Sequence, residues 1–75
     1  MTDTRRFTAM IYREEGGYVA LCPELDVASQ GDSIEDASAN LQEAVELFLE
    51  SADPVEVASR LHAEVFITAL EVRAG

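Results

Sequence analysis

The chain has 75 residues, which is enough for one domain and too few for two. Fifteen Asp and Glu residues against five Lys and Arg give a net charge of −10. That charge disfavours non-specific binding to nucleic acid or to an anionic membrane, and it favours a basic partner. Hydrophobic residues make up 48% of the chain, as in a folded protein. The sequence has neither an apolar run that could span a membrane nor a secretion signal, so we expect a cytoplasmic protein.

A β-hairpin is expected near the start of the chain. Residues 7–13 have the alternation of a strand. The connection that follows ends at Gly17 and contains two glycines, which supply the positive φ that hairpin turns need. Residues 18–22 form the second strand, and Pro23 ends it because proline has no N–H to donate. On the first strand, one side carries Phe7, Ala9 and Ile11, and the other carries Met10 and Tyr12.

A short strand and a long helix follow the hairpin. Residues 27–30 predict the strand, and we expect Gly31 to close it in a turn with positive φ. Asp32 and Ser33 then give the start signal of a helix, a capping oxygen with an acid three residues later. Apolar residues recur from there at steps of three and four, which predicts one amphipathic helix over residues 33–52.

The last third of the chain predicts a short helix and a final strand. Asp53 and Pro54 repeat the start signal, so a helix is expected from there to about Leu61. Residues 64–72 alternate as a strand does. The element order predicts an α+β fold in two layers, with a mostly antiparallel four-stranded sheet and one long helix on one face. We expect residues 1–75 to form this single domain.

The sheet face opposite the long helix is also expected to be apolar. Left bare, it would form an exposed patch of several hundred Å², which is unusual for a monomer. A chain this short, with one cysteine and therefore no internal disulfide, also often needs oligomerisation for stability. We therefore expect self-association through this face. The candidate residues are Met10, Tyr12, Phe66, Leu70 and Val72.

Few residues could carry catalysis or hold a metal. Carboxylate pairs such as Glu24 and Asp26 could bind Mg²⁺ or transfer protons, but a solvated acidic surface is the more common origin of such pairs. His62 has no nucleophile beside it that would complete a triad. Cys22 has acidic neighbours, which raise the pKa of a thiol, so we expect a buried small side chain there. No catalytic residue, metal or cofactor is expected.

Charge is the strongest functional signal in the sequence. Between Glu14 and Glu56 there are twelve acidic residues and no Lys or Arg. Such a run is either a solubilising surface or a face that docks a basic partner and steers its approach. The residues proposed for partner contact are Glu24, Asp26, Glu43, Glu46 and Glu50.

An ordered set of short motifs closely resembles the HicB-like antitoxin domain. No piece is specific alone, but together they cover nearly the whole chain. The pieces are Gly16–Ala20, Cys22–Asp26, Ser29–Ser33, the acid-rich helix Asn40–Glu50 and the tail Glu64–Thr68.

The resemblance implies a truncated RNase H-like β-β-β-α-β domain that self-associates as a dimer or tetramer. It further implies a non-enzymatic antitoxin that blocks a small basic mRNA-cleaving toxin, HicA. The motif residues expected to form turns and helix caps are Gly17, Pro23, Gly31, Asp32 and Ser33.

Two other functions stay open: a self-associating structural domain without a toxin, and a relict nuclease with a carboxylate-held metal. The chain ends at Gly75 without the DNA-binding segment of many antitoxins, so we expect no promoter or other nucleic-acid binding by this chain alone.

Overall fold

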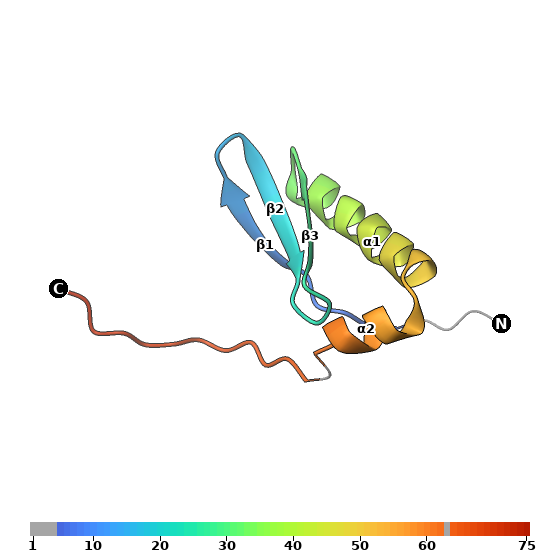
Figure 1. Cartoon of the computed structure of the whole chain (residues 1–75). Coiled ribbons are helices and arrows are strands. Elements are labelled where there is room, and N and C mark those ends of the chain that lie inside the picture. Colours follow the sequence, from blue (N-terminus) through green and yellow to red (C-terminus); the bar gives the residue numbers. More distant parts are fainter. Residues whose placement is uncertain (1–4, 63) are drawn as a thin grey trace.

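One long helix lies along one face of a three-stranded antiparallel sheet (Figure 1). The structure is a computed structural model, and it describes residues 5–62 and 64–75. The strands, in the sheet order β1-β2-β3, are β1 (Met10–Glu14), β2 (Gly17–Cys22) and β3 (Val27–Gly31). The helices are α1 (Ile34–Ser51) and α2 (Pro54–Arg60). The predicted α+β class, the first three strands and both helices are confirmed.

The strand register separates a covered face of the sheet from an open one. In β2, Ala20 and Cys22 are fully buried under α1. The residue between them, Leu21, stands opposite Met10 of β1 and Ala28 of β3. Because side chains alternate across a strand, these three form an apolar row on the open face.

The core is small and lies between the sheet and α1. The helix contributes Ala37, Leu41 and Val45, as its apolar stripe predicted. Leu25, in the connection between β2 and β3, is fully buried and had no predicted place. The other buried residues are Ala20 and Cys22, and the partly buried ones around them are Phe7, Ile11, Tyr18, Val27, Phe48 and Leu49.

Both helices begin at the predicted caps. The Ser33 hydroxyl accepts a hydrogen bond from the backbone N–H of Asp36 at 3.0 Å, which starts α1. The Asp53 carboxylate accepts from the N–H of Glu56 at 2.9 Å, with Pro54 at the first helical position of α2. Each side chain satisfies one of the N–H groups that have no partner inside a helix.

The predicted roles of Gly17 and Gly31 were wrong. Neither residue has a positive φ; in the hairpin only Gly16 has one, at 82°. Glycine is needed at both positions because a side chain would not fit there. A Cβ on Gly17 would lie 2.7 Å from the carbonyl oxygen of Gly31, and a Cβ on Gly31 would meet the backbone of the first turn of α1.

The predicted fourth strand forms no pairing among the described residues. Residues 64–75 leave the domain after His62 and run away from it as an extended tail (Figure 1). Within the described chain no strand lies beside the tail, and a strand needs a neighbour to satisfy its backbone. The radius of gyration is accordingly 14.4 Å, against about 11 Å for a compact chain of this length.

Candidate interaction surfaces

Glu24 holds the segment before β1 in place. Continuing the register of β1 and β2 puts Thr8 opposite Pro23, which has no N–H, so the regular ladder stops there. In place of the ladder, the Glu24 carboxylate accepts hydrogen bonds from the Thr8 N–H at 3.0 Å and from the Thr8 hydroxyl at 2.6 Å. This explains why β1 begins at Met10, whereas the sequence pattern predicted a strand that begins at residue 7.

The Glu24 carboxylate and the buried thiol of Cys22 each affect the pKa of the other. Partial burial raises the pKa of Glu24, but the hydrogen bonds from Thr8 outweigh burial and leave that pKa below its ordinary value. Burial, aided by the nearby Glu24 charge, raises the pKa of Cys22, whose thiol donates to the carboxylate at 3.5 Å. Cys22 is therefore a protonated core residue, as predicted, because a reactive thiolate needs the opposite shift.

Replacing Glu24 with glutamine should destabilise the fold in a pH-dependent way. A carboxylate with a lowered pKa in the folded state contributes stability above its unfolded pKa, near 4.5, and loses it as the pH falls through the folded value. We expect Glu24→Gln to cost about 1.5–3 kcal/mol at pH 7, the range for hydrogen bonds to a charged group. The difference from the wild type should shrink below pH 4.5, as measured by urea denaturation across pH.

Glu46→Gln is the matched control, because it removes the same charge from an exposed position on α1. It should change the free energy of unfolding by no more than about 0.5 kcal/mol. A Glu24→Gln cost that stays the same from pH 7 to pH 3 would show that the carboxylate charge has no part in holding Thr8.

The acidic residues cover much of the exterior. Eleven of the twelve between Glu14 and Glu56 are exposed, and Glu24 is the exception. Of the five residues predicted to contact a partner, Glu24 therefore differs from the rest, since its carboxylate is bound by Thr8. The four exposed ones are Asp26, in the connection between β2 and β3, and Glu43, Glu46 and Glu50 on α1.

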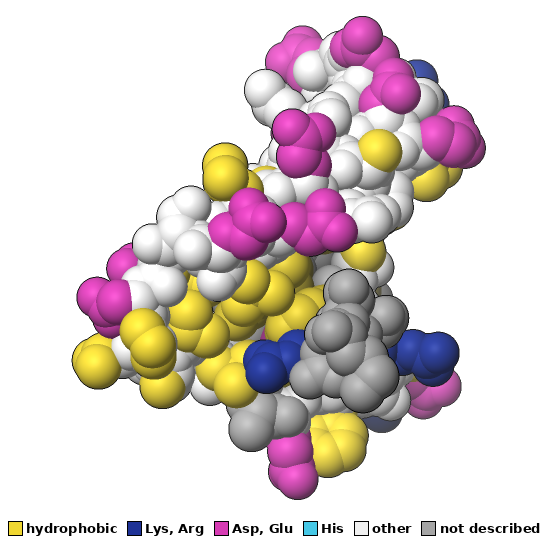
Figure 2. Space-filling model, turned by 90° about the vertical axis from the view of Figure 1, so that its right-hand side faces the viewer, with side chains coloured by type: hydrophobic (Ala, Val, Ile, Leu, Met, Phe, Trp, Pro, Cys, Tyr) yellow, Lys and Arg dark blue, Asp and Glu magenta, His cyan; other side chains and the backbone are white. Residues whose placement is uncertain are grey.

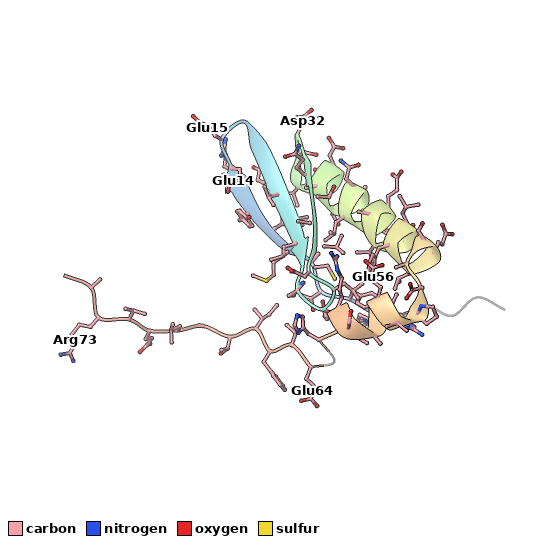
Figure 3. The ribbon with its side chains drawn as sticks, viewed as in Figure 1. Glu14, Glu15, Asp32, Glu56, Glu64 and Arg73 are labelled. Atoms are coloured by element: carbon pink, nitrogen blue, oxygen red, sulfur yellow. The ribbon has the colours of Figure 1, made fainter. Side chains whose placement is uncertain are left out.

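A second group of acids lies at the hairpin end of the sheet. Glu14, Glu15 and Asp32 are close together there (Figure 3) and line one shallow hollow of about 210 Å³. Among the described residues, no three His, Cys, Asp or Glu side chains are arranged to hold a metal ion. The His62 side chain is exposed, and its backbone N–H donates to the Glu24 carbonyl at 2.7 Å.

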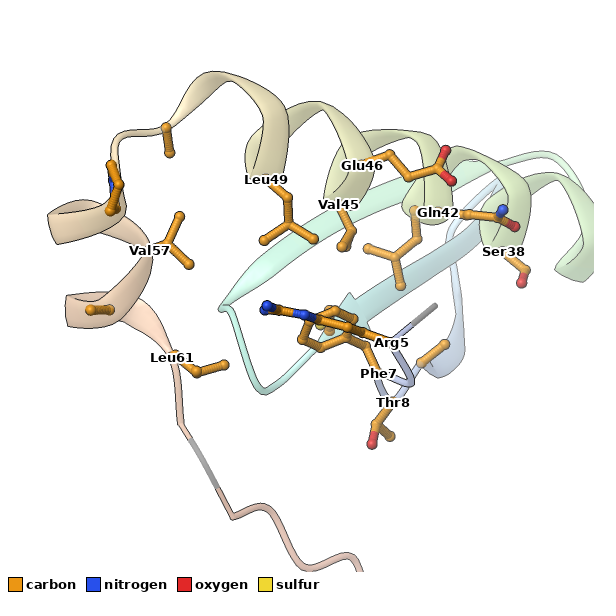
Figure 4. A pocket seen from close by; sticks show the side chains of 16 residues that line it. Arg5, Phe7, Thr8, Ser38, Gln42, Val45, Glu46, Leu49, Val57 and Leu61 are labelled. Carbon is orange, nitrogen blue, oxygen red and sulfur yellow. The ribbon is translucent and has the colours of Figure 1, made fainter. Parts of the chain in front are cut away.

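A groove of about 880 Å³ opens between α1, α2 and the segment before β1. Val45 and Leu49 of α1, Val57 of α2 and the nearby Leu61 face it from one side, and Phe7 faces it from the other (Figure 4). Figure 2 shows the hydrophobic side chains gathered in the hollow on this side of the molecule, with acidic side chains around them. The groove could not be predicted from the sequence because it depends on how α2 is placed relative to α1 and the segment before β1.

A cation–π contact helps to fix the wall that α2 forms. The Arg60 guanidinium lies 5.2 Å from the centre of the Phe48 ring, joining the end of α2 to α1. This contact links the two helices that bound the groove.

The five residues predicted for self-association are divided between two parts of the molecule. Met10 and Tyr12 lie on the open face of the sheet and are 40% and 49% exposed. Phe66, Leu70 and Val72 lie on the extended tail and are more exposed still. The chain by itself does not bring the two groups together, because the tail is not part of the sheet.

No helix among the described residues has the length and apolar character needed to cross a bilayer. No protein-family model matches the chain. No solved structure matches it either.

Three curated proteins are similar to this chain in sequence. A UPF0150 protein of Synechocystis sp. is 47% identical over 47 residues, which are 60% of each chain. A second UPF0150 protein of that organism is 50% identical over 38 residues, so the match covers 49% of this chain and 53% of that one. The chain thus spans little more than half the length of these two relatives.

A third relative, a UPF0150 protein of Helicobacter pylori, is 43% identical over 51 residues, which are 67% of this chain and 71% of the relative. The identity and the coverage together show that the chain belongs to the UPF0150 protein family.

Proposed function

We propose that this chain is a non-enzymatic HicB-type antitoxin domain, which binds a small basic HicA-type mRNA-cleaving toxin in the cytoplasm and blocks it. The observation that carries the proposal is the exposed acidic surface. Eleven acids without an intervening Lys or Arg are presented to solvent. A surface with many negative charges speeds the approach of a positively charged protein and disfavours RNA as a ligand.

The spacing of the acids on α1 supports a docking role over a merely solubilising one. Glu43, Glu46 and Glu50 follow at steps of three and four, so they lie along one line of the helix surface. Like charges at such spacings each destabilise a helix by a few tenths of a kcal/mol. A cationic partner removes that repulsion, so the chain binds such a partner more favourably than a neutral one.

The resemblance to the HicB-like domain supports the same function through the fold. The three antiparallel strands followed by α1 have the same order as the first four elements of the β-β-β-α-β domain that the resemblance implies. We propose that residues 64–72 supply its fourth strand once the protein is assembled.

Isothermal titration calorimetry of the full chain with the basic toxin candidate encoded beside it tests the proposal. We expect a complex at micromolar concentration whose affinity falls as salt rises, because charge attraction is screened. The triple variant Glu43→Gln, Glu46→Gln and Glu50→Gln should bind at least about tenfold more weakly, a loss of about 1.4 kcal/mol.

The matched control changes Glu14, Glu15 and Glu64 to glutamine, which alters the net charge equally but away from α1. It should keep most of the affinity. Equal losses in both triple variants would contradict a specific docking face, and no complex at all would contradict the antitoxin role. RNA incubated with the chain and Mg²⁺ should stay intact, since cleavage would show an enzyme.

A further inference from the structure

Because the tail is exposed, the chain presents more apolar surface to solvent than a stable monomer normally does. Phe66 and Leu70 are 85% and 84% exposed, and Ile67 and Val72 are also largely bare. The whole chain exposes 6351 Å², whereas a compact monomer of this mass exposes about 4,500 Å². The excess is larger than the roughly 800 Å² that each partner buries in a standard interface.

The sheet has a free edge that the tail could join. β2 pairs on both sides, whereas β1 pairs only with β2 among the described residues. A free edge presents N–H and C=O groups that readily pair with another strand. At the opposite edge, α1 lies close to β3, and the Asn40 side chain there donates to the Gln30 carbonyl at 2.7 Å. The β1 edge is therefore the more available one.

The groove lies on the β1 side and suits one row of tail side chains. Phe7 and Ala9, which immediately precede β1, line it. A strand added at this edge would turn alternate side chains toward the groove and toward the open face. The smaller row of the tail consists of Val65, Ile67 and Ala69.

The larger row of the tail would then extend the open face of the sheet. Phe66, Leu70 and Val72 would join Met10 and Tyr12 there. The five residues that the isolated chain leaves on separate segments would form one apolar surface.

We infer that residues 64–72 of one copy form a fourth strand on β1 of a second copy, with one row of side chains in the groove, so that two copies exchange tails. The occupant is a second copy because the tail leaves its own domain at His62 and runs away from the sheet (Figure 1). Two-fold exchange closes the assembly, since each copy gives one strand and receives one. This inference is independent of toxin binding.

Proline in the tail tests the exchange without disturbing the domain. Thr68→Pro removes a backbone N–H from the middle of the proposed strand, and this residue is exposed in the single chain. Light scattering of the wild type should give twice 8.2 kDa, and Thr68→Pro should give 8.2 kDa at tens of micromolar. Ala74→Pro, two residues beyond the proposed strand, should leave the dimer intact.

Mixed isotope labelling distinguishes the exchange from other arrangements. In a sample of labelled and unlabelled copies, we expect nuclear Overhauser effects between Ile67 of one copy and Phe7 or Ile11 of the other. The same contacts found only within one copy would overturn the inference, because the tail would then close on its own sheet. A dimer without these contacts would overturn it too, since the copies would pair through another surface.

Discussion

Replacing Gly31 with alanine should lower the free energy of unfolding by about 3 kcal/mol, the upper end for overpacking a tightly packed site. The added Cβ would lie 2.7 Å from the carbonyl carbon of Asp36 and would also meet the N–H nitrogen of Ala37. Both atoms belong to the backbone of the first turn of α1, so no side chain can rotate away. Relief requires α1 to move off the end of β3.

The measurement is urea denaturation followed by circular dichroism, with Gly16→Ala as the control. Gly16 has a φ of 82° and nothing within 4 Å of its added Cβ. Alanine there meets only backbone strain, on the order of 1 kcal/mol. A smaller loss for Gly31→Ala than for Gly16→Ala would mean that α1 shifts easily and that close approach of helix and strand is not what the glycine provides.

The helices were predictable because their signals are local. A cap such as Ser33 or Asp53 contacts an N–H only three residues away, so the sequence contains the whole interaction. The apolar stripe of α1 is likewise a property of one segment. The first three strands follow from alternation and from the breaks at Gly16 and Pro23, and the structure moved their ends by no more than about three residues.

The contacts of Glu24 and Gly31 could not be predicted, because they join distant parts of the chain. Glu24 had the pattern of a surface acid, yet its partner Thr8 lies sixteen residues away. Gly31 comes at the end of a predicted strand, as a turn glycine would, but α1 approaches it too closely for a side chain. Only the packed arrangement shows that both residues serve the fold.

The groove and the tail were unpredictable for a related reason. The groove arises where α2 and the segment before β1 face α1, and no periodicity in the sequence specifies that angle. The alternation of residues 64–72 predicts a strand, but pattern alone does not say which edge, or which copy, such a segment joins.

Leu25→Ala should cost about 3 kcal/mol, within the range for buried leucines. Leu25 is fully buried although it lies in a connection, and the next residue, Asp26, adopts a φ of 56°. Leu47→Ala is the control, since Leu47 is 60% exposed on α1 and alanine is the better helix former. We expect its cost to stay below about 0.5 kcal/mol in the same denaturation experiment.

A chain of this length has a total stability of only about 4–11 kcal/mol. The loss at Leu25 would therefore be a large fraction of the whole, and the variant should populate the unfolded state at 37 °C. Equal midpoints for the two leucine variants would mean that the connection between β2 and β3 is not anchored in the core. It would also remove the support for Glu24, which lies in the same connection and holds Thr8 beside the groove.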